Sequence, residues 1–289
     1  MDPTHRPVRL ALPKGRMQQE ISRLLDDAGI RVRMSERDYR PSLSLPGFEA
    51  KILKPRNVIG MLEAGARDLG FAGADWVEET GASLVELCDT RLDPVRLVAA
   101  APSSILEDGR LPARPIVVAS EYESLATRWI DRTQLDARVL TTYGATEVFP
   151  PEDADCIIDN TATGSTLRAN GLTIIDEVLT SSTRLYANPA ALENPVLEPR
   201  IRNFAVLLES VLEARRRVMI DLNVAASDLE RVIEFIPCMR EPSISRLHEE
   251  GWFAVRAAVP RDRLAEIIPA LKAAGARDLV TSRPEQIIP

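Results

Sequence analysis

Apolar residues along the first eighty positions switch repeatedly between short continuous runs and a helical spacing. Residues 8–12 form a short apolar run, and residues 17–28 carry apolar side chains every three to four positions. The same pair of patterns recurs at residues 50–64 and again at residues 68–79. Strands that alternate with helices in this way favour a parallel sheet, so this part of the chain is predicted to be α/β.

A second α/β region is predicted in the middle of the chain. Two helices are expected there, over residues 123–133 and 201–215, and two separate strand-like runs cover residues 172–179 and 183–187. Four more strands are predicted, at residues 97–101, 116–119, 137–140 and 155–159, the last of them buried. Residues 38–48, with two prolines and a glycine, are predicted to be a loop.

After residue 217 the apolar and polar residues alternate as they do in half-buried strands. Ser227 is expected to cap the first helix of this region. We predict strands over residues 219–224, 244–247, 252–259 and 278–281, and helices over residues 227–235 and 261–274. The order is βαββαβ, which is typical of a ferredoxin-like module. Modules of this kind often bind amino acids or join subunits, although a fold alone does not define a function.

The charge balance argues against a nucleic-acid-binding protein. The chain has 289 residues, with 43 acidic and 36 basic side chains and a formal net charge of −7, whereas coating nucleic acid requires a basic surface. Only four of the basic residues are lysines, and three of them, Lys14, Lys51 and Lys54, fall in the first 54 positions. Any phosphorylated ligand must therefore be held by a local supply of cations.

Histidine and cysteine are too scarce for several kinds of chemistry. His5 and His248 are the two histidines, which argues against imidazole metal sites and Ser/His/Asp catalysis, and both are expected to be exposed. The three cysteines are far apart and are expected to be reduced core residues. The first residues do not resemble a signal peptide, and no apolar run is long enough to span a membrane. A cytoplasmic protein is therefore expected.

The polar run that follows the buried strand at residues 155–159 is the best candidate for a binding loop. Thr163, Gly164, Ser165 and Thr166 offer three hydroxyls and successive backbone N–H groups ahead of a predicted helix, and Asp159 precedes them. Glycine lets the backbone approach a phosphate closely, and a helix N-terminus favours its charge. Asp159 suits hydrogen bonding to ribose hydroxyls. An ordinary helix cap is the alternative. The run is neither a Walker loop nor a GxGxxG motif.

Two turns in the first α/β region are weaker candidates. Lys14 and Arg16 flank Gly15 between the first strand and the first helix, where they suit a pyrophosphate or triphosphate group. Gly73 and Asp75 lie in a turn before another helix. A solvated pair of surface charges is the alternative for the first turn, and simple helix capping by Asp75 is the alternative for the second.

The segments that carry a family resemblance are residues 10–17, 68–75, Glu147, 159–172, 237–247 and 251–255. In this order along the chain they resemble the long form of the ATP phosphoribosyltransferase family of histidine biosynthesis. Two positions depart from the family motifs: Asn160 stands where the family signature usually has an aliphatic residue, and one residue before Lys14 is absent from the opening motif. Each motif is moderately specific, but their joint order is highly specific.

The resemblance implies a catalytic region of two α/β lobes like a type II periplasmic binding protein, followed by a ferredoxin-like (ACT-like) regulatory domain. Lobe I would hold residues 1–100 and 184–216, lobe II residues 101–183, and the regulatory domain residues 217–289. In the implied reaction, N1 of the adenine of ATP displaces pyrophosphate from phosphoribosyl diphosphate (PRPP) and gives phosphoribosyl-ATP. Mg²⁺ would be held mainly by substrate phosphates. Histidine would inhibit, and dimers would assemble into a hexamer.

The resemblance also implies roles for individual residues. Lys14, Arg16 and Asp159 would be catalytic, and Asp221 and Ser243 would contact the inhibitor histidine. The PRPP-binding residues would be Glu147, Asp159, Thr161, Ala162, Thr163, Gly164, Ser165 and Thr166. The residues on the ATP side of the cleft would be Lys14, Gly15, Arg16, Gly73 and Asp75. Two alternatives stay open, namely a bilobal ligand sensor without chemistry and a PRPP-dependent transferase that acts on another base.

Overall fold

The computed structural model describes residues 6–34 and 39–288, which divide into two compact units. Of these residues, the first unit holds 6–26, 30–34 and 39–205, and the second holds 27–29 and 206–288. The long helix α7 (Glu198–Arg216) and the short helix α6 (Pro189–Leu192) follow the last strand of the first unit. Among the described residues, no helix is both long and apolar enough to cross a membrane.

One eight-stranded sheet runs through the whole first unit, in the order β4-β1-β5-β10-β6-β9-β7-β8. Its first three strands, their helices and a separate two-stranded sheet of β2 and β3 form lobe I. These elements are β1 (Val8–Pro13), α1 (Arg16–Asp27), β2 (Val32–Arg33), β3 (Ser42–Leu43), β4 (Phe48–Leu53), α2 (Pro55–Glu63), β5 (Leu69–Gly73) and α3 (Ala74–Thr80). β1 pairs with β4 and β5 in parallel, as the alternation of strands and helices predicts.

Lobe II is built on the last three strands of the same sheet. Its elements are β7 (Ile116–Ser120), α4 (Glu123–Thr133), β8 (Ala137–Thr141), the 3₁₀ turn η2 (Thr146–Val148), β9 (Cys156–Thr161) and α5 (Ser165–Ala169). The two faces of the sheet bury different cores, because Leu97 and Ile158 pack with α4 residues whereas Val98 and Ile157 pack with Leu167 of α5. Helices α4 and α5 therefore cover opposite faces of lobe II.

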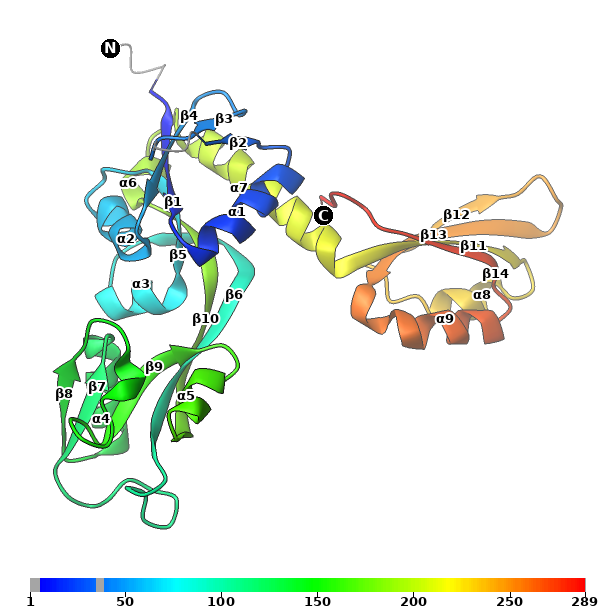
Figure 1. Ribbon diagram of the computed structural model, residues 1–289. Coiled ribbons are helices and arrows are strands. Elements are labelled where there is room, and N and C mark those ends of the chain that lie inside the picture. The colour runs from blue at the N-terminus through cyan, green and yellow to red at the C-terminus, as the bar shows by residue number, and fades with distance from the viewer. Residues whose placement is uncertain (1–5, 35–38, 289) are drawn as a thin grey trace. The chain divides into compact units, whose positions relative to one another are not determined.

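Two long antiparallel strands, β6 (Val85–Pro102) and β10 (Leu172–Ala187), connect the lobes (Figure 1). The register of this pair shifts at several points between Ile174 and Tyr186, and Arg91 and Asp93 have positive φ angles. Such bulges bend a strand without ending it. The predicted crossings near residues 101 and 184 both fall within these strands.

The second unit contains a four-stranded sheet in the order β12-β13-β11-β14. Its elements are β11 (Arg217–Ala225), α8 (Leu229–Glu234), β12 (Ser243–Arg246), β13 (Trp252–Pro260), the 3₁₀ turn η3 (Arg261–Arg263), α9 (Leu264–Ala273) and β14 (Arg277–Ser282). Alternate residues of β11, from Ile220 to Val224, are buried in a core with Ile267 and Leu271 of α9. The predicted ferredoxin-like βαββαβ order is therefore confirmed.

Several local predictions were wrong. The two runs at residues 172–179 and 183–187 form the single strand β10, because bulges absorb the polar interruption. Ser227 does not cap α8. It lies in a turn closed by the N–H of Asp228 and the carbonyl of Ala225, and Asp228 is the residue that precedes the helix. The predicted helix over residues 261–274 begins as η3 before α9.

Candidate functional site

The loop between β9 and α5 is a tight turn built around a glycine with a positive φ angle. Gly164 has a φ of +74°, and its N–H donates to Oγ1 of Thr161 at 2.9 Å. The hydroxyls of Thr163 and Ser165 lie 2.9 Å apart, and both residues are exposed together with Ala162 and Thr166. The N–H groups of the first turn of a helix have no intrahelical partners. The loop therefore places its hydroxyl-bearing residues Thr163, Ser165 and Thr166 at the surface, while the N–H of Gly164 is bonded inside the loop.

Asp159 lies on the strand that leads into this loop and carries a perturbed carboxyl group. Burial raises the pKa of Asp159 from 3.8 to about 6, against the lowering effect of a hydrogen bond from the N–H of Asn160 at 2.7 Å, and the carboxylates of Glu147 and Glu121 raise it further. The predicted residue Glu147, in η2, therefore lies close enough to act on Asp159. Hydroxyl donors or a cationic ligand would stabilise the ionised form of such a carboxyl group.

The turn of lobe I that holds Lys14, Gly15 and Arg16 is exposed. The Lys14 ammonium donates to the hydroxyl of Tyr39 at 3.1 Å and lies 5.0 Å from the centre of its ring. Nε of Arg16 lies 3.5 Å from the carboxylate of Asp93 on β6. Both cationic side chains are exposed, Lys14 beside the exposed Tyr39 and Arg16 at the long distance of 3.5 Å from the half-buried Asp93, so both remain accessible to a ligand.

A buried network surrounds the predicted residue Asp75 at the start of α3. Its two carboxylate oxygens accept hydrogen bonds from the hydroxyls of Ser181 and Tyr122, each at 2.6 Å. The Tyr122 hydroxyl in turn accepts a hydrogen bond from the Asn160 side chain at 2.9 Å. Gly73 leaves room for this carboxylate, since a Cβ there would collide with Oδ1 of Asp75. The structure thus brings Asp75 of lobe I to the strand end that carries Asp159.

The sequence analysis did not identify Tyr122 and Ser181. A signal existed for Tyr122, because residues 120–122 follow a predicted strand of a parallel sheet, and ligand sites gather at the carboxyl ends of such strands. Ser181 gave no such signal, because it lies in the polar interruption between two strand-like runs. Burial and its electrostatic interaction with Asp75 raise the pKa of Tyr122 far above its usual value, so this hydroxyl stays a hydrogen-bond donor.

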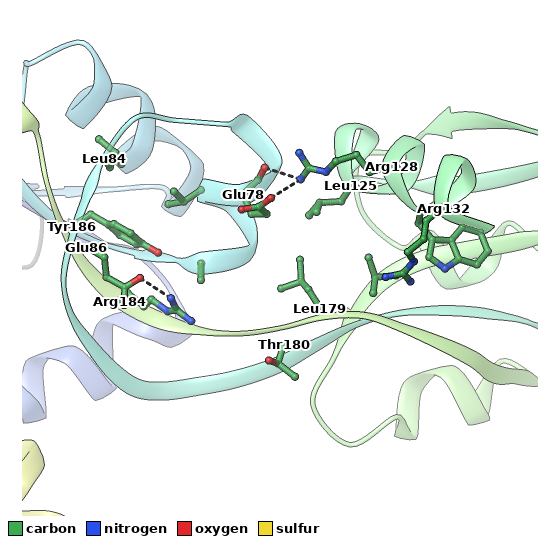
Figure 2. A pocket seen from close by; sticks show the side chains of 14 residues that line it. Glu78, Leu84, Glu86, Leu125, Arg128, Arg132, Leu179, Thr180, Arg184 and Tyr186 are labelled. Carbon is green, nitrogen blue, oxygen red and sulfur yellow. Dashed lines mark hydrogen bonds and ion pairs between the residues drawn. The ribbon is translucent and has the colours of Figure 1, made fainter. Parts of the chain in front are cut away.

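A cavity of about 550 Å³ lies between α3, α4 and the two long strands (Figure 2). Its polar walls include the ion pairs Glu78–Arg128 at 3.0 Å and Glu86–Arg184 at 2.6 Å, and Leu125 and Leu179 contribute apolar surface. None of the predicted site residues lines this cavity. A more open hollow of about 730 Å³ lies beside α1 and does include Gly15.

In the second unit, the predicted residues Asp221 and Ser243 lie in one row across three strands. Arg256 of β13 stands between them, directly opposite Asp221 on one side and Ser243 on the other. Nε of Arg256 donates to Oδ1 of Asp221 at 2.5 Å. The sequence analysis missed Arg256, because strand register decides which residues become neighbours.

Within residues 6–34 and 39–288, no group of three or more His, Cys, Asp or Glu side chains is arranged to hold a metal ion. His248 is exposed, and His5 lies outside the described residues. Cys88 and Cys156 are buried and Cys238 is half-buried, with none in a disulfide.

The fold and the site together define a class: a two-lobed α/β protein with a hydroxyl-rich glycine loop on one lobe and an exposed cationic turn on the other. Comparison with known proteins identifies the family. Residues 54–210 match the family model described as ATP phosphoribosyltransferase, and residues 214–283 match that of the HisG C-terminal domain. The chain belongs to the ATP phosphoribosyltransferase family.

Individual relatives match almost the whole chain. A Chlorobaculum parvum protein named ATP phosphoribosyltransferase is 35% identical over 284 residues, which cover 96% of this chain and 97% of the relative. A protein of the same name from Pelotomaculum thermopropionicum is 34% identical over 289 residues, covering 98% and 99%. A solved structure, the ATP phosphoribosyl transferase (HisG:HisZ) complex from Thermotoga maritima, aligns with a TM-score of 0.63 at 25% identity over 71% of this chain and 98% of that chain.

Proposed function

We propose that this chain transfers the phosphoribosyl group of PRPP to N1 of the adenine of ATP, as the first step of histidine biosynthesis. The observation that carries the proposal is the loop at residues 161–166, with a positive-φ glycine and exposed hydroxyls directly after Asp159. Family membership supports ATP and PRPP as the substrates. The alternative of a sensor without chemistry is disfavoured, because the loop and the cationic turn both keep groups suited to phosphates.

The proposed reaction replaces one bond at the ribose carbon C1. The bond from C1 to the pyrophosphate oxygen breaks, and its electron pair leaves with the pyrophosphate. The lone pair of adenine N1 forms the new C1–N bond. No proton moves in this step, so the protein needs no strong general base. Positioning of the two substrates and stabilisation of the charge on pyrophosphate then supply the catalysis.

In this proposal lobe II binds the ribose 5-phosphate part of PRPP. The hydroxyls of Thr163, Ser165 and Thr166 and the N–H groups at the start of α5 hold the 5-phosphate, and Gly164 gives the loop its shape. Asp159, supported by Glu147, accepts hydrogen bonds from the ribose hydroxyls. The raised pKa of Asp159 is consistent with this role, because hydroxyl donors would stabilise its ionised form.

Lys14 and Arg16 of lobe I would stabilise the pyrophosphate or the phosphates of ATP. Both residues are exposed, and a polyanion attracts cations more strongly than a single carboxylate such as Asp93 does. Gly15, with a φ of +93° and open space around its Cα, allows the backbone between them to approach a phosphate.

Mg²⁺ fits the proposed chemistry as an ion carried by the substrates. The carboxylates of Glu147 and Glu121 both raise the pKa of Asp159, which indicates local negative charge that favours a cation nearby. Mg²⁺ prefers oxygen ligands, keeps several waters and is usually bound through substrate phosphates with one or two carboxylates. When bound, it would neutralise charge on the pyrophosphate, and Asp159 or Glu147 would contribute at most one or two ligands.

Regulation by histidine is proposed for the second unit. The Asp221 carboxylate would pair with the cationic group of histidine and Ser243 would contact its polar end, and their shared row on the sheet supports this assignment. Arg256, which already pairs with Asp221, would have to release it. Assembly from dimers into a hexamer and a cytoplasmic location remain predictions.

The substitution Thr166→Ala tests the loop assignment. A lost hydrogen bond to a charged phosphate should raise the KM for PRPP about 10-fold or more, with little change in the KM for ATP. Thr127→Ala is a matched control, because Thr127 lies exposed on α4 and bonds only within its own helix, to the carbonyl of Glu123. Equal PRPP kinetics for the two variants would contradict the assignment, and turnover with another base but not with ATP would identify the alternative transferase.

A further inference from the structure

Helix α3 of lobe I carries two buried carboxylates one turn apart, and both of them bind lobe II. Asp75 accepts the hydroxyl hydrogen bond of Tyr122 at 2.6 Å. Glu79 accepts the backbone N–H groups of Ser124 and Leu125, at the start of α4, at 3.0 and 2.9 Å. These five residues are called the α3 clamp below.

The acidic and tyrosine side chains of the clamp are buried, so their hydrogen bonds resist exchange with water. Asp75 is 5% exposed, Glu79 is 8% exposed and Tyr122 is fully buried. Trp76, which lies between the two carboxylates on α3, stacks on the Tyr122 ring with centroids 4.3 Å apart. Removing one partner leaves a buried polar group unpaired, which is far more unfavourable than losing an exposed contact. The N-terminus of α4 also favours the negative charge of Glu79.

The lobe II end of the clamp reaches the ribose-binding carboxylate. Tyr122 accepts a hydrogen bond from Asn160, and Asp159 is the preceding residue on β9. Asn160 lies opposite Leu97, and Asp159 lies opposite Val98. Neighbouring residues of a strand point to opposite faces, so Asn160 points towards the clamp while Asp159 points to the face covered by α5.

The lobe I end of the clamp lies next to the cationic turn in the sheet. Asp75 follows β5, and β5 pairs in parallel with β1, whose end carries Lys14. The clamp therefore connects, through two adjacent strand ends, the groups proposed to hold the ribose with those proposed to hold the pyrophosphate.

We propose that Asp75 and Glu79 are positioning residues, which fix the angle between the lobes at which the phosphate loop faces the Lys14 turn. This inference rests on the proposed phosphoribosyl transfer. It explains why the Asp75 carboxylate is fully engaged by protein hydroxyls and unavailable to substrate. It also gives a role to Glu79 and Tyr122, which touch no substrate group in the proposed reaction.

The clamp predicts a particular split between kinetic constants. PRPP binds mainly to groups within lobe II, so its KM should change less than about threefold when the clamp is weakened. A weakened clamp should instead misalign adenine N1, C1 and the leaving group between the lobes. Misplacement by about 1 Å lowers rates by about 10- to 100-fold. We expect Glu79→Gln and Tyr122→Phe each to lower kcat about 10-fold or more, and the double variant to lower it further.

Two matched controls separate this role from a general loss of folding. Glu78→Gln changes the adjacent residue of α3, whose exposed ion pair with Arg128 also joins the lobes (Figure 2) but should contribute little. Tyr186→Phe removes a hydroxyl from another buried tyrosine, on β10. Both controls should keep kcat within about twofold of the unsubstituted protein. Rates are normalised to folded protein measured by circular dichroism.

Steady-state kinetics of the five variants, with ATP and PRPP each varied, decide the matter. A kcat for Glu79→Gln and Tyr122→Phe equal to that of their controls would overturn the inference, as would an increase confined to the KM for PRPP. If Glu79→Gln does not fold, Tyr122→Phe carries the test alone, since it retains the ring and its stacking on Trp76. An inactive unsubstituted protein would refute the proposed function instead, so the two failures are distinguishable.

Discussion

Replacing Asp159 with asparagine should stabilise the protein while it weakens catalysis. A carboxyl group whose pKa is 3.8 when the chain is unfolded and about 6 when it is folded disfavours folding once it is ionised. At about 1.4 kcal/mol per unit of pKa, the shift between the unfolded and folded states lowers the stability by about 3 kcal/mol at neutral pH. Asparagine has nearly the same shape and can still accept the N–H of Asn160, but it carries no charge to bury.

The effect has a defined pH dependence. The folded state binds more protons than the unfolded state between pH 3.8 and about 6, so the unsubstituted protein loses stability as the pH rises through this window. The advantage of Asp159→Asn should therefore be small near pH 4, grow up to about pH 6 and stay constant above it. Thermal unfolding of the ligand-free protein measures this, at about 2–4 °C per kcal/mol for a unit of this size.

Asp155→Asn supplies a control of opposite sign at the other end of the same strand. Burial acts to raise the pKa of Asp155, but hydrogen bonds from Arg114 at 2.7 Å and from the N–H of Val117 at 2.8 Å outweigh it and lower that pKa. Ionised Asp155 thus stabilises the fold at pH values above its ordinary pKa, and this stabilisation is lost as the pH falls. Asp155→Asn should be destabilising at pH 7. A melting temperature for Asp159→Asn equal to or below that of the unsubstituted protein at pH 8 would refute the reasoning.

Two further outcomes are expected. Gly73→Ala should lower the melting temperature by the equivalent of about 1–3 kcal/mol and also lower kcat, because the new Cβ displaces the Asp75 carboxylate from the clamp. Gly60→Ala is the control and should be neutral or stabilising, because a Cβ there meets no atom within 4 Å. Equal melting temperatures for the two variants would contradict the prediction. Asp221→Ala should abolish inhibition by histidine at unchanged kcat, and retained inhibition in a histidine titration would remove Asp221 from the regulatory site.

Local patterns predicted much of the fold. The helix over residues 123–133 has the predicted bounds, because its apolar spacing and flanking turns are both local. The polar run after Asp159 indicated a tight loop, since small hydroxylated residues around a glycine favour one backbone shape, and Gly164 has that positive φ. The ferredoxin-like order of the second unit followed from strict alternation along β11 and β13.

Features that depend on contacts between distant residues could not be predicted. The hydrogen bond between Tyr122 and Asp75 joins residues 47 positions apart, and no spacing rule connects them. Arg256 became visible only through the register of β13 with its two neighbours. The unbroken strand β10 was missed because its bulges allow polar residues such as Ser181 to be buried and paired.

Product analysis tests the central claim most directly. The purified full chain is mixed with ATP, PRPP and Mg²⁺, and the ultraviolet absorbance of phosphoribosyl-ATP is followed together with the release of pyrophosphate. Our account predicts one pyrophosphate per phosphoribosyl-ATP formed, no reaction when either substrate is omitted, and a strongly reduced rate for Thr166→Ala at low PRPP. Binding of PRPP without product, or a product formed on a base other than the adenine of ATP, would contradict it.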